Sequence, residues 1–317
     1  MLHQNNLNIF GGVFVFNPLD DPYHMERIKN NLNSIILAAK KSKKRINLLI
    51  SMNCSPVETP DGVISGVGTK TKDMIKYICK DAGIKTKEYR EEISSACARG
   101  YNDLLIYGYN NTDAEKIVIF ADDYIMPSFW FDMMSLNFDK NPEASFVMPI
   151  TSYVSQDNLR VNIENHPNWD VRVAPKGDHK KWNYQTIYGG VEIEHIEEIS
   201  KKFIYDGVVG YLDPPSFETT MFKRELIEKV GFIHEEYFSC FYDSDYFNMI
   251  KSKGLKGVIA RNCFIFHYGK GATKALYKET ADEKYKNSPV EKLLLKDIEV
   301  WNKRNNQNVK PWWGEKK

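Results

Sequence analysis

Residues 11–56 read GGVFVFNPLDDPYHMERIKNNLNSIILAAKKSKKRINLLISMNCSP, and the apolar pattern of this stretch predicts the fold. The apolar run Val13–Phe16 is ended by an Asn-Pro pair, which is typical of a buried strand that opens into a loop. From about Tyr23 to Lys43 the apolar residues recur at helical spacing, and the basic run Lys40–Arg45 follows where a helix dipole favours cations. Ile46–Ile50 is a second apolar run. A strand, a helix and a strand in this order predict a βαβ unit and a parallel sheet.

The composition of the whole chain limits what the protein can be. It has 317 residues, of which 42% are hydrophobic and 13% aromatic, and its formal charge is +1. This much apolar material excludes a disordered chain, and the balanced charge disfavours a nucleic-acid coat or a polybasic membrane tether. No apolar run approaches the roughly 20 residues that span a bilayer, and Met1–Phe10 lacks the pattern of a signal peptide. The five scattered cysteines form no CxxC pair. We therefore expect a cytoplasmic protein, or one of the host-cell cytoplasm if its source is viral.

The rest of the chain continues the α/β pattern. Further helices are predicted at 71–81, 91–107, from Pro127 through Met134, 224–230, 243–253 and 290–303, and further strands at 116–120, 145–149, 219–222, 258–260 and 263–266. The Gly-rich stretch 61–71 does not match GxGxxG and is predicted to be a flexible surface loop. Residues 150–210 show little pattern. The expected fold class is α/β, with a mixed, mostly parallel sheet flanked by helices and a C-terminal helical tail.

Two adjacent carboxylates, Asp122 and Asp123, directly follow the apolar strand 116–120. Open α/β sheets bind their ligands at the carboxyl ends of the strands. Neighbouring carboxylates repel each other, and a hard divalent cation such as Mg²⁺ or Mn²⁺ relieves that repulsion while leaving positions open for phosphate oxygens. The alternative is that both carboxylates cap the helix predicted after Pro127.

A second acidic pair, Asp243 and Asp245, opens the helix predicted at 243–253. Carboxylates in the first turn stabilise a helix through its dipole, and a partly desolvated carboxylate among aromatic residues can also act as a base. His267 follows the strand predicted at 263–266. A single histidine at a strand end is either structural or a ligand.

The order of these motifs resembles the GT-A glycosyltransferases and, within them, the large family 2. The resemblance covers about residues 8–272. It rests on Phe16-Asn17 after the first strand, Met52-Asn53-Cys54-Ser55 after the second, Ala98-Arg99 with Asn102, Phe120-Ala121-Asp122-Asp123, Arg224-Glu225 with Gly231, Phe232 and Glu235, then Asp243-Ser244-Asp245, Gly254 and His267. The sequence departs from the family at Met52, where a base-binding Asp is usual, and at Tyr242, where a Glu is usual. It also lacks the Arg that follows Asp-x-Asp in the family.

The resemblance implies a GT-A-type, Rossmann-like sheet and an inverting, metal-dependent transfer of a sugar from a nucleotide-diphosphate sugar, a UDP-sugar above all, to an acceptor hydroxyl. Asp123, helped by Asp122 and His267, would hold Mn²⁺ or Mg²⁺, and Asp243 would be the general base. Asp245 would orient or cap its helix. The donor-binding residues carried over are Phe16, Asn17, Asn53, Arg99, Asn102 and Asp122.

The same resemblance divides the chain into a donor-binding half at 1–125, an acceptor-binding half at 126–272 and a helical tail at 273–317. The acceptor is a glycan, a lipid, a small molecule or a modified DNA base. A transferase of the phage or viral type that acts on DNA would use a basic groove, for which the Lys-rich segments 40–45, 176–181 and 270–286 are candidates. Trp130, Trp182 and Tyr242 are candidates for stacking on a sugar or base. The competing hypothesis is a GT-A-like domain that binds a nucleotide or glycan without turnover, and a nucleotidyltransferase ranks below both.

Overall fold

The computed structural model describes residues 8–59, 62–92, 97–151, 197, 217, 219–267 and 289–310. They form an eight-stranded sheet in the order β5-β2-β1-β6-β9-β8-β10-β7 and a separate two-stranded hairpin, β3-β4. The strands are β1 (Asn8–Val15), β2 (Arg45–Asn53), β3 (Pro56–Thr59), β4 (Gly62–Ser65), β5 (Lys85–Tyr89), β6 (Lys116–Phe120), β7 (Tyr124–Ile125), β8 (Ala144–Thr151), β9 (Met221–Lys223) and β10 (Lys256–His267). The helices are α1 (Pro22–Lys41), α2 (Thr69–Ala82), α3 (Ala98–Asn111), α4 (Trp130–Lys140), α8 (Arg224–Val230), α9 (Tyr242–Ser252) and α11 (Pro289–Asn305).

Most strands of the large sheet run in one direction. β1 pairs in parallel with β2 and β6, β2 pairs in parallel with β5, and β8 pairs in parallel with β10. β9 lies antiparallel between β6 and β8, and β7 lies antiparallel to β10. The strands β5, β2, β1, β6, β8 and β10 therefore share a direction, and their carboxyl ends meet at one side of the sheet. We call this side the carboxyl edge.

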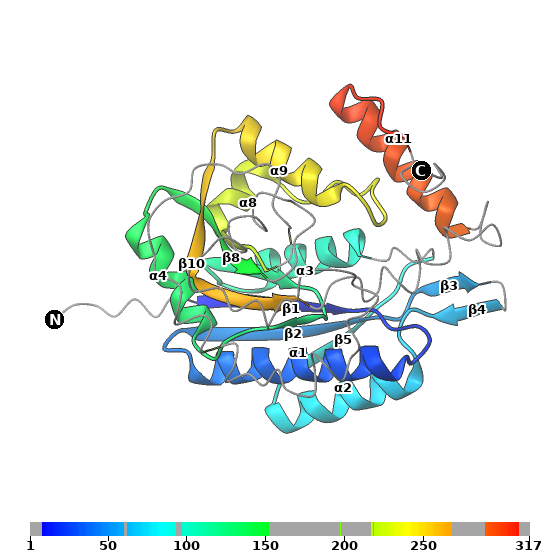
Figure 1. The fold of residues 1–317 in the computed structure, drawn as a ribbon, viewed down its shortest axis with the longest axis horizontal. Coiled ribbons are helices and arrows are strands. Elements are labelled where there is room, and N and C mark those ends of the chain that lie inside the picture. The colour runs from blue at the N-terminus through cyan, green and yellow to red at the C-terminus, as the bar shows by residue number, and fades with distance from the viewer. Residues whose placement is uncertain are drawn as a thin grey trace, which may run out of the picture.

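Helices cover both faces of the sheet. Figure 1 shows α1 and α2 on one face and α3, α8 and α9 on the other, with α11 beyond α9. Alternate side chains of β1 face the two layers: Ile9 and Val13 belong to the core beneath α1, α2 and α4, whereas Phe10 and Phe14 belong to the core beneath α3 and α9. The mixed, mostly parallel α/β sheet flanked by helices, with a helix at the C-terminal end of the described chain, confirms the predicted fold class.

Two glycines let α3 lie unusually close to β1. A Cβ atom added to Gly100 would lie 2.0 Å from Cζ of Phe14, and one added to Gly108 would lie 2.4 Å from Cδ1 of Phe10. Eight helix residues rise about 12 Å and four strand residues about 13 Å, so the two glycines match the spacing of the two phenylalanines. Each aromatic ring therefore occupies the volume that a larger helix residue would take.

Gly100→Ala is expected to destabilise the protein by about 1–3 kcal/mol, because the added methyl group overpacks the Phe14 ring. The direction of the change in stability is informative. Alanine stabilises a helix by about 1 kcal/mol relative to glycine, so a loss of stability has to come from the overpacked ring. The free energy of unfolding in urea measures the effect. Asn110→Ala, at an exposed position of the same helix, is the control and should change stability by less than about 0.5 kcal/mol. A Gly100→Ala variant as stable as the wild type would contradict the close approach.

Several predicted elements agree with the structure to within about two residues, among them α1, α2, α8 and α9. Glycines end α2 and α8: Gly83 has a φ of 69° and Gly231 a φ of 89°. The helix predicted at 91–107 was wrong at its start, because α3 begins at Ala98 and continues to Asn111. The two strands predicted at 258–260 and 263–266 form the single strand β10, with a register irregularity between Ala260 and Phe264.

The Gly-rich stretch 61–71 is not the flexible loop that was predicted. It contains β4 and the start of α2, and backbone hydrogen bonds join it to the loop after β1. The backbone N of Asn17 donates to the Gly66 carbonyl oxygen at 2.9 Å, and the N of Gly68 donates to the Asn17 carbonyl oxygen at 3.0 Å. A Cβ atom on Gly66 would lie 2.8 Å from the backbone oxygen of Asn53. The glycine is therefore required by a close packing contact.

None of the helices in the described part of the chain combines the length and the apolar composition needed to cross a membrane.

Candidate functional site

The carboxyl edge brings together side chains that are far apart in sequence. Asp122 and Asp123 lie two and three residues beyond the end of β6. β10 pairs antiparallel with the short strand β7, which places His267 opposite Tyr124. Nε2 of His267 consequently lies 3.3 Å from Oδ1 of Asp123. Two residues that the resemblance assigns to a metal are thus neighbours in space.

The Asp123–His267 pair is mostly buried. The Asp123 residue is 6% exposed, and the His267 ring stacks on Tyr124 with ring centroids 4.1 Å apart. Burial alone raises the pKa of Asp123, but the charge and hydrogen bond of His267, together with the charge of His24, outweigh burial and lower that pKa below its usual value. Asp123 is therefore an ionised carboxylate at neutral pH, as a metal ligand must be.

Asp122 joins β6 to the loop after β1. Its Oδ2 accepts a hydrogen bond from the backbone N of Phe16 at 2.9 Å and lies 3.3 Å from Nε2 of His24. The same Nε2 lies 3.1 Å from the Phe16 carbonyl oxygen. Both oxygens are acceptors, so Nε2 carries a proton that they share. Burial alone lowers the pKa of His24, but the charges of Asp122 and Asp123 outweigh burial and raise it.

The sequence prediction missed His24. Its position in α1, eight residues beyond Phe16, gives no motif, and its role follows only from the contact of α1 with the loop after β6. Asp122 uses one carboxylate oxygen to accept from the backbone N of Phe16, directly after β1, and the predicted role of Phe16 in donor binding stays a prediction.

The alternative that Asp122 and Asp123 cap the following helix is wrong. α4 begins at Trp130, its N-cap residue is Phe129, and no side chain caps it. The two carboxylates instead contact histidines from α1 and β10.

Asn17 is a structural residue in this arrangement. It is 3% exposed, its Nδ2 donates to Oγ1 of Thr71 at 3.0 Å, and its Oδ1 accepts from the backbone N of Asp21 at 3.1 Å. The acidic residues of the same loop start two helices. Asp21 accepts from the backbone N of His24 at the start of α1, and Asp20 accepts from the backbone N of Thr71 in α2. Two adjacent carboxylates of the loop after β1 thus bind it to the first turns of α1 and α2.

Asn53 ends β2 at the same edge and is fully buried. Its Oδ1 accepts from the backbone N of Ser55 at 3.1 Å, which closes the turn toward β3. Met52, which stands where the family has a base-binding Asp, is 1% exposed and belongs to the core beneath α1 and α2.

Arg99 and Asn102, at the start of α3, both hold the segment that follows α8. Arg99 donates from Nε to the Glu235 carbonyl oxygen at 3.0 Å, and its guanidinium lies 4.3 Å from the ring centroid of Phe238. Asn102 accepts from the backbone N of Ile233 at 2.9 Å through its Oδ1. These two residues link the first half of the chain to the segment that leads into α9.

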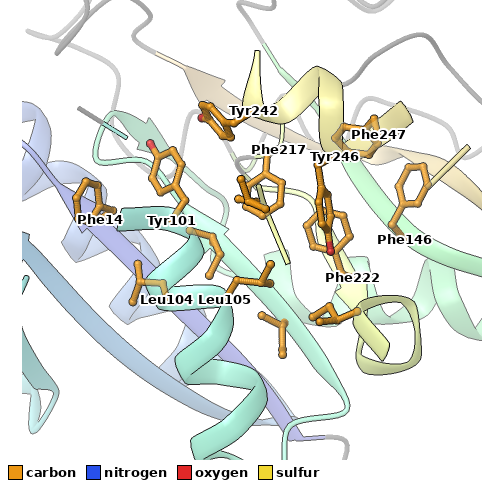
Figure 2. Close-up of a cluster of buried hydrophobic side chains, with 14 of the residues drawn as sticks. Phe14, Tyr101, Leu104, Leu105, Phe146, Phe217, Phe222, Tyr242, Tyr246 and Phe247 are labelled. Carbon is orange, nitrogen blue, oxygen red and sulfur yellow. The ribbon is translucent and has the colours of Figure 1, made fainter. Parts of the chain in front are cut away.

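Asp243 lies in the first turn of α9, at the same end of the molecule as the carboxyl edge. Ring contacts connect the two places, as Figure 2 shows: Phe14, near the end of β1, lies 5.6 Å from Tyr101, which lies 5.8 Å from Tyr242. Oδ1 of Asp243 accepts from the backbone N of Ser244 at 2.7 Å. The predicted general base therefore starts a helix that is connected to the end of β1 through the Tyr101 ring of α3.

Asp245 does not cap α9, contrary to one of the predicted roles. It is 4% exposed, and both of its carboxylate oxygens accept from Nε of Arg304 in α11, at 3.1 and 3.2 Å. The sequence lacks an Arg next to Asp-x-Asp, and the structure supplies one from a helix about 60 residues further along the chain. Sequence spacing gave no signal for this pair.

The other residues predicted to contact a ligand are buried in the core, lie away from the carboxyl edge or fall outside the described residues. Trp130 is fully buried against Phe120 and Phe131, which excludes stacking on a sugar. Tyr242 is 5% exposed and contributes to the core. The basic run 40–45 joins the end of α1 to the start of β2, at the opposite side of the sheet from the carboxyl edge. Trp182 and the Lys-rich segments 176–181 and 270–286 lie outside the described residues, as do most of residues 150–210.

The spacing of the donor atoms at Asp123 fits two ligands of one divalent cation. Two ligands at adjacent octahedral positions of Mg²⁺ lie about 3 Å apart when the bonds are about 2.1 Å long. The 3.3 Å between Nε2 of His267 and Oδ1 of Asp123 is close to that spacing. Within the described residues no three His, Cys, Asp or Glu side chains converge as a complete set of ligands.

Comparison with known proteins gives similarity in structure only. No protein-family model matches the chain, and no curated protein sequence matches it. Among solved structures, S. aureus TarS aligns at 11% identity with a TM-score of 0.47 over 94% of this chain. This chain spans 43% of the TarS chain. TarS 1–349 in complex with UDP aligns at 10% identity and a TM-score of 0.45, over 95% of this chain and 73% of that one. The mannosyltransferase PcManGT from Pyrobaculum calidifontis, in complex with GDP-Man and Mn²⁺, aligns at 13% identity and a TM-score of 0.49, over 96% of this chain and 76% of that one.

Proposed function

We propose that this protein is a metal-dependent glycosyltransferase of the family 2 type, which moves a sugar from a nucleotide-diphosphate sugar to an acceptor hydroxyl with inversion. The observation that carries the proposal is the juxtaposition of Asp123 and His267 at the carboxyl edge, 3.3 Å apart. This edge is where an open α/β sheet binds a nucleotide. β1, β2 and β6 contribute the loops that surround the bound donor.

Asp123 and His267 would hold Mn²⁺ or Mg²⁺, and Asp122 brings a second carboxylate to the same place. When bound, such a cation neutralises charge on a diphosphate leaving group. The protein's own contribution is to keep Asp123 ionised and the two carboxylates fixed. His24 and the Phe16 backbone N hold Asp122.

Asp243 is the proposed general base. It would accept the proton of the acceptor hydroxyl as the oxygen attacks the anomeric carbon. The bond from that carbon to the diphosphate oxygen breaks, and the nucleoside diphosphate leaves with the electron pair. One displacement inverts the configuration and needs no covalent intermediate. The position of Asp243 in the first turn of α9, which the rings of Tyr242 and Tyr101 connect to the end of β1, supports this role.

The proposal assigns donor binding to residues 1–125 and acceptor binding to residues 126–272, in a cytoplasmic protein. Asn17 and Asn53 fix the loops around the donor through hydrogen bonds of their own. Arg99 and Asn102 fix the segment that leads to the base.

Mn²⁺ together with a matching nucleoside diphosphate is expected to raise the melting temperature of the protein, and Asp123→Ala should lose that effect. A ligand at 100 times its dissociation constant stabilises the folded state by about 2.7 kcal/mol, which is on the order of 5 °C for a chain of this size. The measurement is a thermal-shift screen of UDP, GDP and their sugars, with and without Mn²⁺.

Asp139→Asn, an exposed carboxylate of α4, is the matched control and should keep the full shift. A shift that is equal in wild type and Asp123→Ala would place the metal elsewhere. A metal-dependent shift without any hydrolysis or transfer of the sugar would favour the non-catalytic binding domain.

A further inference from the structure

The C-terminal helix α11 is bound to the segment that precedes Asp243 through one buried carboxylate. Asp297 is fully buried, and its two oxygens accept from three consecutive backbone N atoms: Phe238 at 2.8 Å, Ser239 at 2.7 Å and Cys240 at 2.7 Å. Three successive N–H groups thus converge on one carboxylate, which fixes the turn at 238–240. Burial raises the pKa of Asp297, and the three N–H donors oppose that rise.

The residue that follows this turn is strained. Phe241 has a φ of 61°, a left-handed conformation that is rare for a non-glycine residue. Trp301 of α11 stacks on the Phe241 ring, with centroids 5.2 Å apart and planes at 24°. Phe241 is also the N-cap residue of α9, so its conformation sets the direction in which the helix starts.

A further contact from α11 reaches α9 itself. Arg304 pairs with Asp245, which lies two residues beyond Asp243 on the same helix turn. Asp297, Trp301 and Arg304 are spaced by four and three residues, so they lie on one face of α11. That face binds the turn at 238–240, the strained Phe241 and the first turn of α9.

We propose that Asp297 is a positioning residue for Asp243: it fixes the turn at 238–240, so that α9 starts with the base correctly placed at the carboxyl edge. This inference rests on the proposed role of Asp243. It makes α11 part of the catalytic unit and not merely a tail. Asp297 acts through the backbone of the turn and does not touch the reacting atoms.

The test is a double-mutant cycle of Asp297→Asn and Asp243→Asn. Turnover is followed as nucleoside diphosphate released from the nucleotide sugar found in the screen above, with water or an acceptor as the nucleophile. Asp297→Asn is expected to lower kcat about tenfold, since small misplacements of a catalytic group have effects of this size. The KM for the donor, and the shift given by UDP and Mn²⁺, should stay within about twofold of wild type.

The decisive comparison is the effect of Asp297→Asn in the Asp243→Asn background. If Asp297 acts through Asp243, the second substitution causes no further loss there. An equal loss in both backgrounds, an unchanged kcat in the single variant, or a change confined to KM would overturn the inference. If Asp243→Asn turns over as fast as wild type, the proposed base is wrong and this inference falls with it, which is a separate outcome.

Two further variants complete the test, one as a control and one as an alternative to Asp297→Asn. Glu299→Gln changes an exposed carboxylate on the same helix and should keep the wild-type kcat. If Asp297→Asn does not fold, Arg304→Gln leaves the turn at 238–240 intact and removes the contact with Asp245. It is expected to lower kcat in the wild-type background and not in the Asp243→Asn background.

Discussion

Asp243→Asn is expected to slow sugar transfer by about 10²- to 10⁴-fold, the usual contribution of a general base. Asparagine keeps the size of the side chain and its hydrogen bond to the Ser244 backbone N, but it cannot take up a proton from the acceptor hydroxyl. The loss should appear in kcat, because the proton moves only in the transition state. The binding of UDP with Mn²⁺ should be unchanged, because Asp123 and His267 remain.

Glu225→Gln is the control for this prediction. Glu225 is an exposed acidic residue in the first turn of α8, so its substitution removes a similar interaction with a helix dipole. It should leave kcat within about twofold. An Asp243→Asn variant with wild-type kcat would exclude Asp243 as the base, and a variant with a raised KM alone would indicate a role in binding.

Phe222→Ala is expected to reduce the free energy of unfolding by about 3–5 kcal/mol, as is typical for large aromatic side chains removed from a core. Phe222, in β9, is completely buried at the centre of an aromatic cluster (Figure 2). Its ring lies 5.2 Å from Phe217, 5.8 Å from Tyr246 and 6.2 Å from Phe247. The cavity left by alanine would lie between the sheet and α9, so the helix cannot close it without moving.

Unfolding in urea, followed by tryptophan fluorescence and by circular dichroism, measures this effect. Tyr77→Ala removes an aromatic ring of α2 that is 78% exposed, and it should change stability by less than about 0.5 kcal/mol. A loss below about 1 kcal/mol for Phe222→Ala would mean that the cluster is not packed as described.

The sequence predicted the parts of the fold that depend on local pattern. The βαβ unit around α1 has a strong apolar period, and α8 ends at a glycine that suits its backbone. The sequence analysis missed the strand β5. Lys85–Tyr89 lies at the edge of the sheet, and its residues do not alternate between apolar and polar. Charged side chains are common on edge strands, so such a strand lacks the apolar pattern that marks a buried one.

The candidate site was predictable only in part. Asp123 was predicted from its place directly after a buried strand and His267 from a resemblance in motif order, and the structure brings them together through the pairing of β10 with β7. His24, Asp297 and Arg304 had no local signal, since each acts on a residue more than 50 positions away. Contacts of that kind depend on tertiary packing, which a single sequence does not reveal through spacing.

The place of β9 in the sheet has a consequence for how the chain folds during synthesis. β5, β2, β1 and β6 all lie within the first 120 residues, so their pairings can form while the rest of the chain is still being made. β8 follows at Ala144–Thr151, but both of its partners, β9 and β10, come more than 65 residues later. During that interval β6 and β8 expose unpaired edges, which are sites for aggregation. β6 and β8 therefore cannot pair with β9 until the chain has been made as far as Met221–Lys223.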